Sequence, residues 1–549
     1  MCTVGLIAAP VHHDLLITGG TVIDGAGNPG IRADVAVDGD TITAIGPMAD
    51  ALTRGEIEAD TVIDATGRVV CPGFIDPHTH ADSSLLENRL AENFIRDGVT
   101  TLITGNCGGN HWPVAEFLAS AEEGGIAPNI ATLVGHNTVR RRVIGREDRD
   151  PTAEQLASME ALVDQAMREG AMGLSTGLIY IPGTYSETEE IIALARVVAR
   201  HGGLYATHMR SETEEIFSAI EEALRIGREA NVPVHISHFK VRGHAMFEES
   251  AYPLINDLLG SDYEPGAHVP AASRATLALV MRARAQGQDV TLDQYPYPAS
   301  STGLGVMIPD WLRAEGDDHA VEILADPETR ARVRDEIAER YRGRGLEDLD
   351  WAQIASCESD PSLNGLSIRD VTIRRGTPEP TLEDDTETVI DLFMAGGAGM
   401  IFHSQSEDDV MRIMRCPIVG VCSDSSVRRF GSGVPHPRGY GSNARVLARY
   451  VRGLHNITLE EAIRKMTSLN AQRFALRDRG LLREGMRADI VVFNPRTVTD
   501  RATFTDPHQH SEGFDAVIVN GEPVVLDDEV TRARPGRALR GQGFWASGG

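Results

Sequence analysis

Cysteine is scarce in this chain, and its scarcity excludes a fold held together by disulfide bonds. The 549 residues include six cysteines, and no two of them form a CxxC pair. Disulfide-dependent secreted domains show dense, regularly spaced cysteines instead. The six are Cys2, Cys71, Cys107, Cys357, Cys416 and Cys422. We therefore expect reduced thiols and a cytoplasmic protein.

Long apolar runs are also missing. No run approaches the roughly 20 apolar residues that a membrane-spanning helix requires. Residues 1–13 contain a short apolar patch, but they lack the basic stretch that opens a signal peptide. We expect neither a membrane span nor a secretion signal.

Positive charge is the third scarce property. Lys and Arg total 52 against 80 Asp and Glu, which gives a formal net charge of −28. This balance disfavours polyanionic partners such as nucleic acid or an anionic membrane surface. A soluble protein that acts on a small molecule fits better, and the oligomeric state stays open.

Both ends of the chain have the same pattern, typical of β-strands: short runs of alternating apolar and polar residues separated by glycine. The N-terminal runs are 15–20, 33–37, 41–45 and 61–64, and the C-terminal runs are 488–493 and 516–521. Because the two ends match, we expect residues 1–70 and 481–549 to form one small β-sandwich domain together.

Between these ends, apolar runs that finish in polar residues alternate with amphipathic stretches. This alternation is typical of βα repeats around a parallel sheet. The eight runs are 73–76, 100–104, 129–134, 171–175, 203–207, 232–237, 289–293 and 417–422. Eight repeats predict an α/β fold, a (β/α)₈ TIM-like barrel over residues 71–480.

The sequence also predicts the character of several segments that connect the strands. Residues 186–201 are expected to form a helix, with acidic residues near its start and basic residues near its end. Two connections are longer than a βα unit needs, 242–273 and 302–387, and the second carries its own predicted helix over 326–342. Loops of that length at a barrel mouth are usually functional, so 302–387 is predicted to be a lid insertion.

The functional residues of such barrels lie at the carboxyl ends of the strands. His78 and His80, spaced i, i+2 after the first run, can reach one metal ion from an extended strand. The other strand-end residues of this kind are Cys107, His136, His208, His238 and Asp424. Histidine, cysteine and aspartate are zinc ligands, so the sequence predicts a catalytic metal site at one rim of the barrel.

These residues, with several further motifs, resemble the N-acyl-D-amino-acid deacylase (D-aminoacylase) family of the amidohydrolase superfamily. The resemblance covers nearly the whole chain. Its motifs are Gly73-Phe74-Ile75-Asp76-Pro77-His78-Thr79-His80, Gly105-Asn106-Cys107-Gly108, Tyr205-Ala206-Thr207-His208-Met209-Arg210, Ser237-His238-Phe239-Lys240, Asp293-Gln294-Tyr295-Pro296-Tyr297, Ser423-Asp424 and Pro435-His436-Pro437-Arg438.

The resemblance implies a role for each of these residues. Zinc is held tightly by Cys107, His208 and His238, and His78 and His80 form a second, weaker site that shares the cysteine. Asp424 is implied as a metal ligand and as the catalytic carboxylate, and Tyr180 as a hydrogen-bond donor to the reacting carbonyl. The implied substrate-binding residues are Lys240, Tyr295, Ser301 and Arg438.

The implied reaction is zinc-dependent hydrolysis of N-acyl-D-amino acids to a carboxylic acid and a free D-amino acid. Zinc supplies an activated water and a polarised carbonyl. Asp424 takes the proton of the water and passes it to the leaving amine. The segment after Cys107 is shorter than the family leads us to expect, and 242–273 is longer, so the acyl group and the side chain stay open.

Three other functions are compatible with parts of the pattern. A cyclic-amide hydrolase of the hydantoinase type shares the barrel, but it typically bridges two metals with a carboxylated lysine at the fourth strand, where this chain reads Gly173-Leu174-Ser175-Thr176-Gly177. A dipeptidase would cleave a similar amide next to a free carboxylate. A non-catalytic scaffold would be expected to have lost metal ligands.

Overall fold

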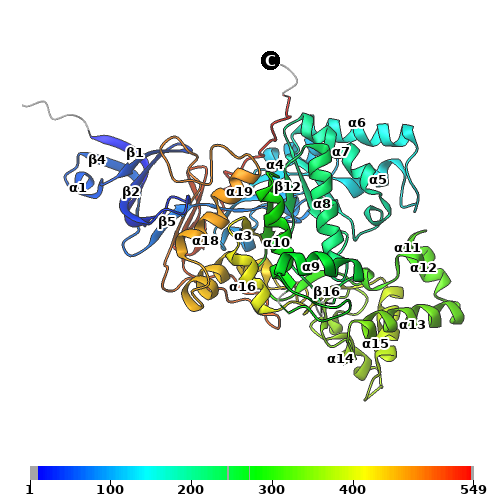
Figure 1. Ribbon diagram of the computed structural model, residues 1–549. Coiled ribbons are helices and arrows are strands. Elements are labelled where there is room, and N and C mark those ends of the chain that lie inside the picture. Colours follow the sequence, from blue (N-terminus) through cyan, green and yellow to red (C-terminus); the bar gives the residue numbers. More distant parts are fainter. Residues whose placement is uncertain (1–9, 244–245, 271, 546–549) are drawn as a thin grey trace, which may run out of the picture.

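The computed structural model describes residues 10–243, 246–270 and 272–545, and it has three parts (Figure 1). Strands from both ends of the chain form a sheet at one side, a βα barrel fills the middle, and an insertion with helices α11 to α15 projects from the barrel. Within the described residues, no helix combines the length and the apolar character needed to cross a membrane.

The β part is built from both termini, as predicted. Its strands are β1 Val11–Val22, β2 Ile31–Asp38, β3 Thr41–Gly46, β4 Ile57–Asp64, β5 Val69–Pro72, β18 Ile490–Phe493, β19 Phe514–Val519, β20 Glu522–Leu526 and β21 Glu529–Val530. The two ends of the chain meet where β5 pairs antiparallel with β18. The domain limits 1–70 and 481–549 themselves stay a prediction.

Hydrogen bonds connect these strands into one nine-stranded sheet that branches at β1. The pairing of β1 with β2 shifts register between Ile17 and Gly20. On its other side, the first part of β1 pairs with β4 and its last residues pair with β5. Apolar side chains from both branches, such as Val35 and Ile518, share one buried cluster, so the sheet encloses a core as a sandwich does.

The eight predicted barrel runs each contain a strand. They are β6 Phe74–Asp76, β7 Val99–Thr104, β8 Asn129–Thr132 with β9 Val134–Gly135, β10 Gly173–Gly177, β11 Leu204–His208, β12 Val234–Ile236, β13 Val290–Gln294 and β17 Val419–Val421. All pair in parallel, in the orders β6-β7-β8 and β9-β10-β11-β12-β13-β17.

The barrel closes between its first and last strands. Thr79 and Ser425, just beyond these strands, form a parallel bridge. Below them, the side-chain amide of Asn470 donates to the carbonyl oxygens of Ile75 at 2.8 Å and Val421 at 3.2 Å. The short strands therefore keep buried hydrogen-bond partners at the seam.

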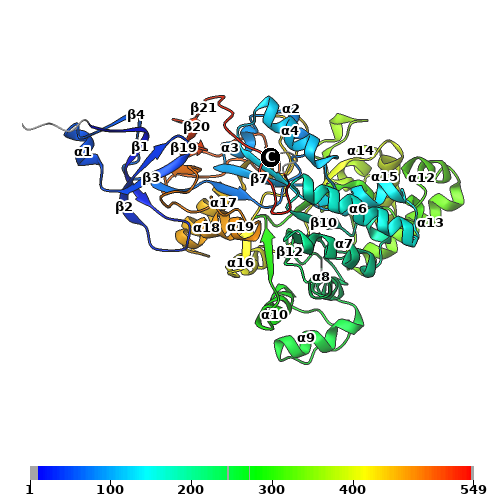
Figure 2. The same cartoon turned by 90° about the horizontal axis from the view of Figure 1, so that it is seen from above.

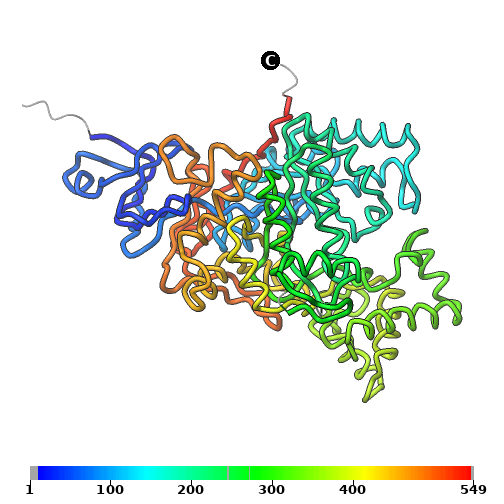
Figure 3. Tube along the Cα trace, viewed as in Figure 1, coloured from blue at the N-terminus to red at the C-terminus, as the bar shows by residue number. Residues whose placement is uncertain are grey.

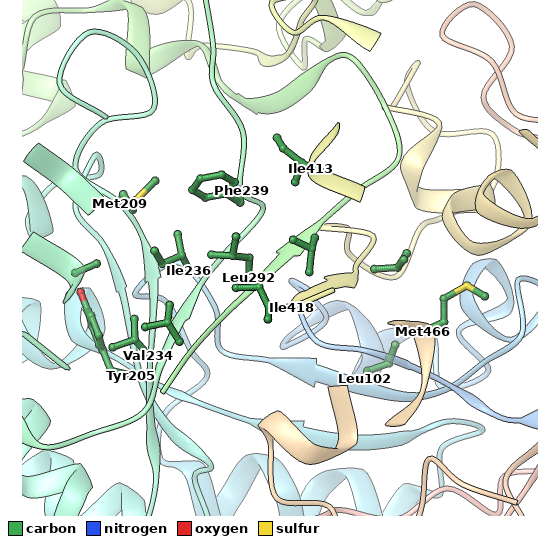
Figure 4. Close-up of a cluster of buried hydrophobic side chains, with 14 of the residues drawn as sticks. Leu102, Tyr205, Met209, Val234, Ile236, Phe239, Leu292, Ile413, Ile418 and Met466 are labelled. Carbon is green, nitrogen blue, oxygen red and sulfur yellow. The ribbon is translucent and has the colours of Figure 1, made fainter. Parts of the chain in front are cut away.

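Alternation along the strands separates the helix-facing core from the barrel interior. Val234, Ile236 and Leu292 lie on the outer face, where they pack in an apolar cluster with Ile413 and Ile418 (Figure 4). Their sequence neighbours His235 and Asp293 have the opposite orientation and contact each other inside the barrel, with His235 Nε2 2.7 Å from Asp293 Oδ2. The barrel interior thus carries polar groups directly below the predicted site.

Helices cover the outside of the barrel (Figure 2). They include α4 Val114–Gly124, α6 Ala153–Glu169, α7 Thr188–Arg200, α8 Ile216–Ala230, α10 Ala272–Ala285, α16 Glu407–Arg415 and α18 Leu459–Met466. Helix α7 confirms the helix predicted over 186–201; it begins later because Glu187 is extended and acts as its N-cap. In the long connection after β12, α9 Tyr252–Leu259 packs beside α10.

The insertion forms a unit with its own core. Its strands β14 Ser300–Gly303, β15 Ala352–Ser356 and β16 Gly399–Phe402 form an antiparallel sheet in the order β14-β16-β15. Its helices are α11 Asp310–Arg313, α12 Asp317–Ile323, α13 Pro327–Gly343, α14 Ile368–Arg374 and α15 Leu382–Met394. The predicted segment 302–387 lies within this unit, and α13 confirms its predicted helix. In the Cα trace the insertion stands away from the β sheet of the termini (Figure 3).

Candidate active site

A cavity of about 330 Å³ opens at the carboxyl ends of the barrel strands. Most of the residues predicted for the site lie along its wall. The lining residues are His80, Cys107, Tyr180, His208, Glu212, His238, Lys240, Arg242, Ser300, Ser301, Thr302, Asp424, Ser426, Arg428 and Arg438. The last of these, Arg438, opens α17 Arg438–Arg445. Loops after β6, β7, β10, β11, β12 and β17 and the first strand of the insertion therefore meet at one place.

The thiol of Cys107 lies at the centre of the cluster of potential metal ligands. Its Sγ is 3.4 Å from His78 Nε2, 3.6 Å from His208 Nδ1 and 3.6 Å from His238 Nε2. Within this cluster, three groups have ligand atoms within 4.8 Å of one another: His78, His80 and Cys107; Cys107, His208 and His238; and His78, His238 and Asp424. The structure thus brings together all six residues predicted as ligands.

Three of these residues have left-handed backbone conformations. The φ angles are 52° for Cys107, 36° for His238 and 52° for Asp424. Such angles are uncommon outside glycine and cost of order 1–3 kcal/mol each. Each of the three directly follows or lies just beyond a strand end, where the left-handed turn directs the side chain into the cavity.

The donor set fits a zinc ion. Burial lowers the pKa of both His78 and His208 well below the usual value for histidine, so both rings are neutral and can bind a cation. Burial also raises the pKa of the Cys107 thiol well above its usual range. A nearby cation is what holds such a thiol as the thiolate that zinc prefers.

Two carboxylates for which no role was predicted, Glu212 and Asp293, lie beside the histidines. Glu212 Oε1 is 3.1 Å from His238 Nδ1, which leaves Nε2 of that ring directed at Cys107. Asp293 accepts a hydrogen bond from the backbone N–H of His238. It also lies 3.9 Å from His78 Nδ1, which has no hydrogen-bond partner among the described residues. Carboxylates on the outer ring nitrogen commonly fix the orientation of metal-binding histidines.

Asp424 is shared between the histidines and Arg438. Its Oδ1 is 3.1 Å from His80 Nε2 and 3.6 Å from His78 Nε2, and its Oδ2 is 2.7 Å from Arg438 Nη1. Burial alone raises the pKa of this carboxyl, but Arg438 and the histidines outweigh burial, and the pKa lies well below its usual value. Asp424 is therefore an ionised acceptor next to the cluster.

The other predicted site residues occupy different positions relative to the cavity. Tyr180 has its ring 4.9 Å from that of His208, and its hydroxyl lies 3.2 Å from Thr302 Oγ1. Burial raises the pKa of Tyr180, so the phenol stays protonated and can donate. Tyr295 lies behind the wall, where its ring contacts the Arg438 guanidinium at 4.7 Å.

Lys240 and Ser301 line the cavity, but both already have protein partners. Lys240 Nζ donates to Glu212 Oε1 at 2.5 Å and to the backbone oxygen of His238 at 2.8 Å. The Ser301 hydroxyl donates to the carbonyl of Met400 at 2.7 Å. Arg438 differs from them because its buried Nε has no hydrogen-bond acceptor among the described residues.

His136 does not join the cluster, although it follows the third strand. Its Nε2 lies 2.7 Å from Glu190 of α7, and Arg140 contacts the same carboxylate. The short helix α5 His136–Val143 begins at this histidine and turns it towards α7. A position just after a strand was therefore not enough to predict whether this histidine belongs to the cluster.

A closed parallel barrel whose strand ends gather imidazoles, a thiol and a carboxylate around a cavity is the arrangement of a metal-dependent hydrolase. Comparison with known proteins agrees with this class. The chain belongs to the amidohydrolase family, whose model (Amidohydro_3) matches residues 61–525.

Individual relatives match over nearly their full length. A D-aminoacylase of Alcaligenes xylosoxydans xylosoxydans is 38% identical over 96% of this chain and 97% of its own. A solved D-aminoacylase with a binuclear metal centre is 36% identical, with a TM-score of 0.77 over 96% of this chain and 100% of that chain. The N-acyl-D-glutamate deacylase of Bordetella bronchiseptica, solved with zinc and a phosphonate mimic of the tetrahedral intermediate, is 33% identical, with a TM-score of 0.78 over 96% and 100%.

Proposed function

We propose that this chain is a zinc-dependent N-acyl-D-amino-acid deacylase, which hydrolyses the amide bond to give a carboxylic acid and a free D-amino acid. The proposal rests on one observation: Cys107 with two neighbouring histidines, Asp424 and Arg438 all line one cavity. The D configuration and the linear amide follow from the full-length similarity to two deacylases of N-acyl-D-amino acids.

The metal ligands divide into two sets around the cysteine. Cys107, His208 and His238 hold the tightly bound zinc, and His78 and His80 complete a second, weaker site that shares Cys107. The similarity to a D-aminoacylase with a binuclear centre supports two sites. When bound, zinc polarises the amide carbonyl and lowers the pKa of water, as in other zinc hydrolases.

The residues of the chain supply proton transfer and binding. Asp424, ionised and beside the ligands, accepts the proton of the attacking water and returns it to the leaving nitrogen. Tyr180 donates to the oxygen on which charge develops. Arg438 binds the substrate carboxylate through its free Nε and its Nη groups, as a planar guanidinium can do with two parallel bonds.

Lys240, Tyr295 and Ser301 assist at this subsite in different ways. Tyr295 supports the Arg438 guanidinium from its ring face, and Ser301 offers its backbone oxygen to Arg438 Nη2 at 3.2 Å. Lys240 keeps Glu212 ionised, since burial would otherwise raise the pKa of that carboxyl, and its positive charge remains at the cavity wall.

A cyclic-amide hydrolase with a carboxylated lysine is not favoured. Strand β10, where that lysine would stand, reads Gly-Leu-Ser-Thr-Gly and is fully buried.

We further propose a cytoplasmic location, since the five cysteines of the described residues are free thiols. The insertion is proposed to act as a lid, because its first strand brings Ser301 and Thr302 into the cavity wall.

The carboxylate subsite gives the first prediction. Wild type should hydrolyse N-acetyl-D-methionine at least about tenfold better than N-acetyl-D-methionine amide or the L enantiomer, measured as kcat/KM. Arg438→Lys keeps the charge but loses the planar fork. We expect it to lower kcat/KM for the acid by an amount corresponding to about 1–3 kcal/mol, with a smaller effect on the amide.

Two controls make this test specific. Arg429→Lys changes an exposed arginine that does not line the cavity, and its kinetics should match those of the wild type. Equal turnover of acid and amide by wild type would contradict the deacylase proposal and favour a general amidase.

A further inference from the structure

The cavity contains more positive than negative side chains. Four cations line it, Lys240, Arg242, Arg428 and Arg438, against two carboxylates. Glu212 pairs with Lys240, and Asp424 pairs with Arg438. Among the described residues, Arg242 and Arg428 form no ion pair, and the residues outside this description include no Asp or Glu.

Arg428 is half-buried, like Arg242, and it lies on the loop that follows β17. Its Nε donates to Ser425 Oγ at 3.1 Å, and no other side-chain hydrogen bond joins it to the described residues. A guanidinium has five N–H donors, so the four on its Nη atoms are available to a ligand. Burial lowers the pKa of Arg428 to about 10, and the neighbouring charge of Arg438 adds to this. Two half-buried or buried cations side by side repel each other, and an anionic ligand that contacts both would relieve this repulsion.

The loop that carries Arg428 is held in place by contacts on both sides. The backbone N–H of Arg428 donates to Asn93 Oδ1 at 3.1 Å, and that of Val427 donates to Ser84 Oγ at 3.1 Å. Further along, Phe430 stacks on His510 with ring centroids 5.3 Å apart. The guanidinium is therefore presented to the cavity by a fixed segment.

Arg242 lies on a different wall of the cavity. It follows β12, its Nε donates to Ser404 Oγ at 3.3 Å, and its guanidinium lies 5.6 Å from the Phe402 ring. It is half-buried, and Ser404 follows the last strand of the insertion. Arg242 thus adds positive charge where barrel and insertion meet, without occupying the position of Arg428.

We propose that Arg428 forms a second anion-binding subsite, so that the preferred substrates carry a negative group in addition to the carboxylate bound by Arg438. The proposal rests on the proposed deacylase function. The second group is a carboxylate, borne either by the amino-acid side chain or by the acyl chain. Arg428 is then a specificity-determining residue, because it contacts a part of the substrate remote from the scissile bond.

Two matched pairs of substrates distinguish the two sources of the negative charge. N-Acetyl-D-glutamate against N-acetyl-D-glutamine tests the side chain, and N-succinyl-D-methionine against N-butanoyl-D-methionine tests the acyl chain. If the second carboxylate belongs to the side chain, the first pair should show the preference; if it belongs to the acyl chain, the second pair should. In that pair, wild type should favour the acidic substrate about 10- to 100-fold in kcat/KM, the scale of a charge-assisted hydrogen bond.

Variants of Arg428 test whether this residue causes the preference for acidic substrates. Arg428→Gln should reduce the acidic-to-neutral ratio about 10- to 100-fold, whereas Arg428→Lys should restore part of it. Arg429→Gln, which changes the exposed neighbour, should keep the wild-type ratio.

Two results would overturn the inference while leaving the deacylase intact: no acidic preference of wild type in either pair, or an equal loss for acidic and neutral substrates in Arg428→Gln. The second result would mean that Arg428 shares the first carboxylate with Arg438. If wild type turned over none of the four N-acyl-D-amino acids, the proposed function itself would fail.

Discussion

Replacing Asp424 by asparagine should leave a folded, zinc-loaded protein with almost no activity. The amide keeps the size of the side chain but cannot accept the proton of water or return it to the leaving amine. General acid–base catalysis contributes about 10²- to 10⁴-fold, so we expect kcat to fall by that factor. Steady-state kinetics on N-acetyl-D-methionine measure the loss of activity, and the zinc content of the same sample shows whether the metal is retained.

The geometry explains why zinc should stay. Asp424 contacts His78 and His80, which belong to the proposed weaker site, whereas Cys107, His208 and His238 form a group without it. Asp408→Asn, an exposed position on α16, serves as the control and should behave as wild type. Near-normal turnover by a folded, zinc-loaded Asp424→Asn protein would remove this residue from the mechanism.

Replacing Cys107 by alanine should remove zinc and activity together. Its Sγ is the atom that both proposed sites share, within 3.4–3.6 Å of His78, His208 and His238. We expect less than about one tenth of the wild-type activity, because metal affinity falls when a first ligand is lost. Zinc content by atomic spectroscopy and kcat/KM should fall in parallel across metal concentrations.

The matched control for this variant is Cys357→Ala, which shortens a buried cysteine in the core of the insertion. It should keep its zinc. Cys107 is interpreted as a ligand and not as a nucleophile. A covalent acyl group trapped on Cys107, or an alanine variant with full zinc and full activity, would refute that interpretation.

The metal cluster could be anticipated because its signals are local in the sequence. Each ligand follows an apolar run, and parallel strands bring their carboxyl ends to one rim. His136 shows the limit of this reasoning: it also follows a strand, but it pairs with Glu190, which in turn pairs with Arg140, and it stays outside the cluster. The sequence does not show which way a side chain turns after a strand ends.

The residues that escaped prediction act through partners distant in sequence. Glu212 lies four positions beyond His208, and its importance comes from its contacts with His238 and Lys240. Arg428 is one of 52 basic residues until the fold places it at the cavity wall.

The most direct test of the central claim is metal reconstitution. The protein should be stripped of metal with a chelator, titrated with Zn²⁺, and assayed on N-acetyl-D-methionine while bound zinc is counted. We expect activity to be absent in the stripped protein and to reach most of its maximum by about one bound zinc per chain, as expected if Cys107, His208 and His238 form the tight site. Full activity of the stripped protein, or no turnover of the substrate at any zinc occupancy, would contradict the account.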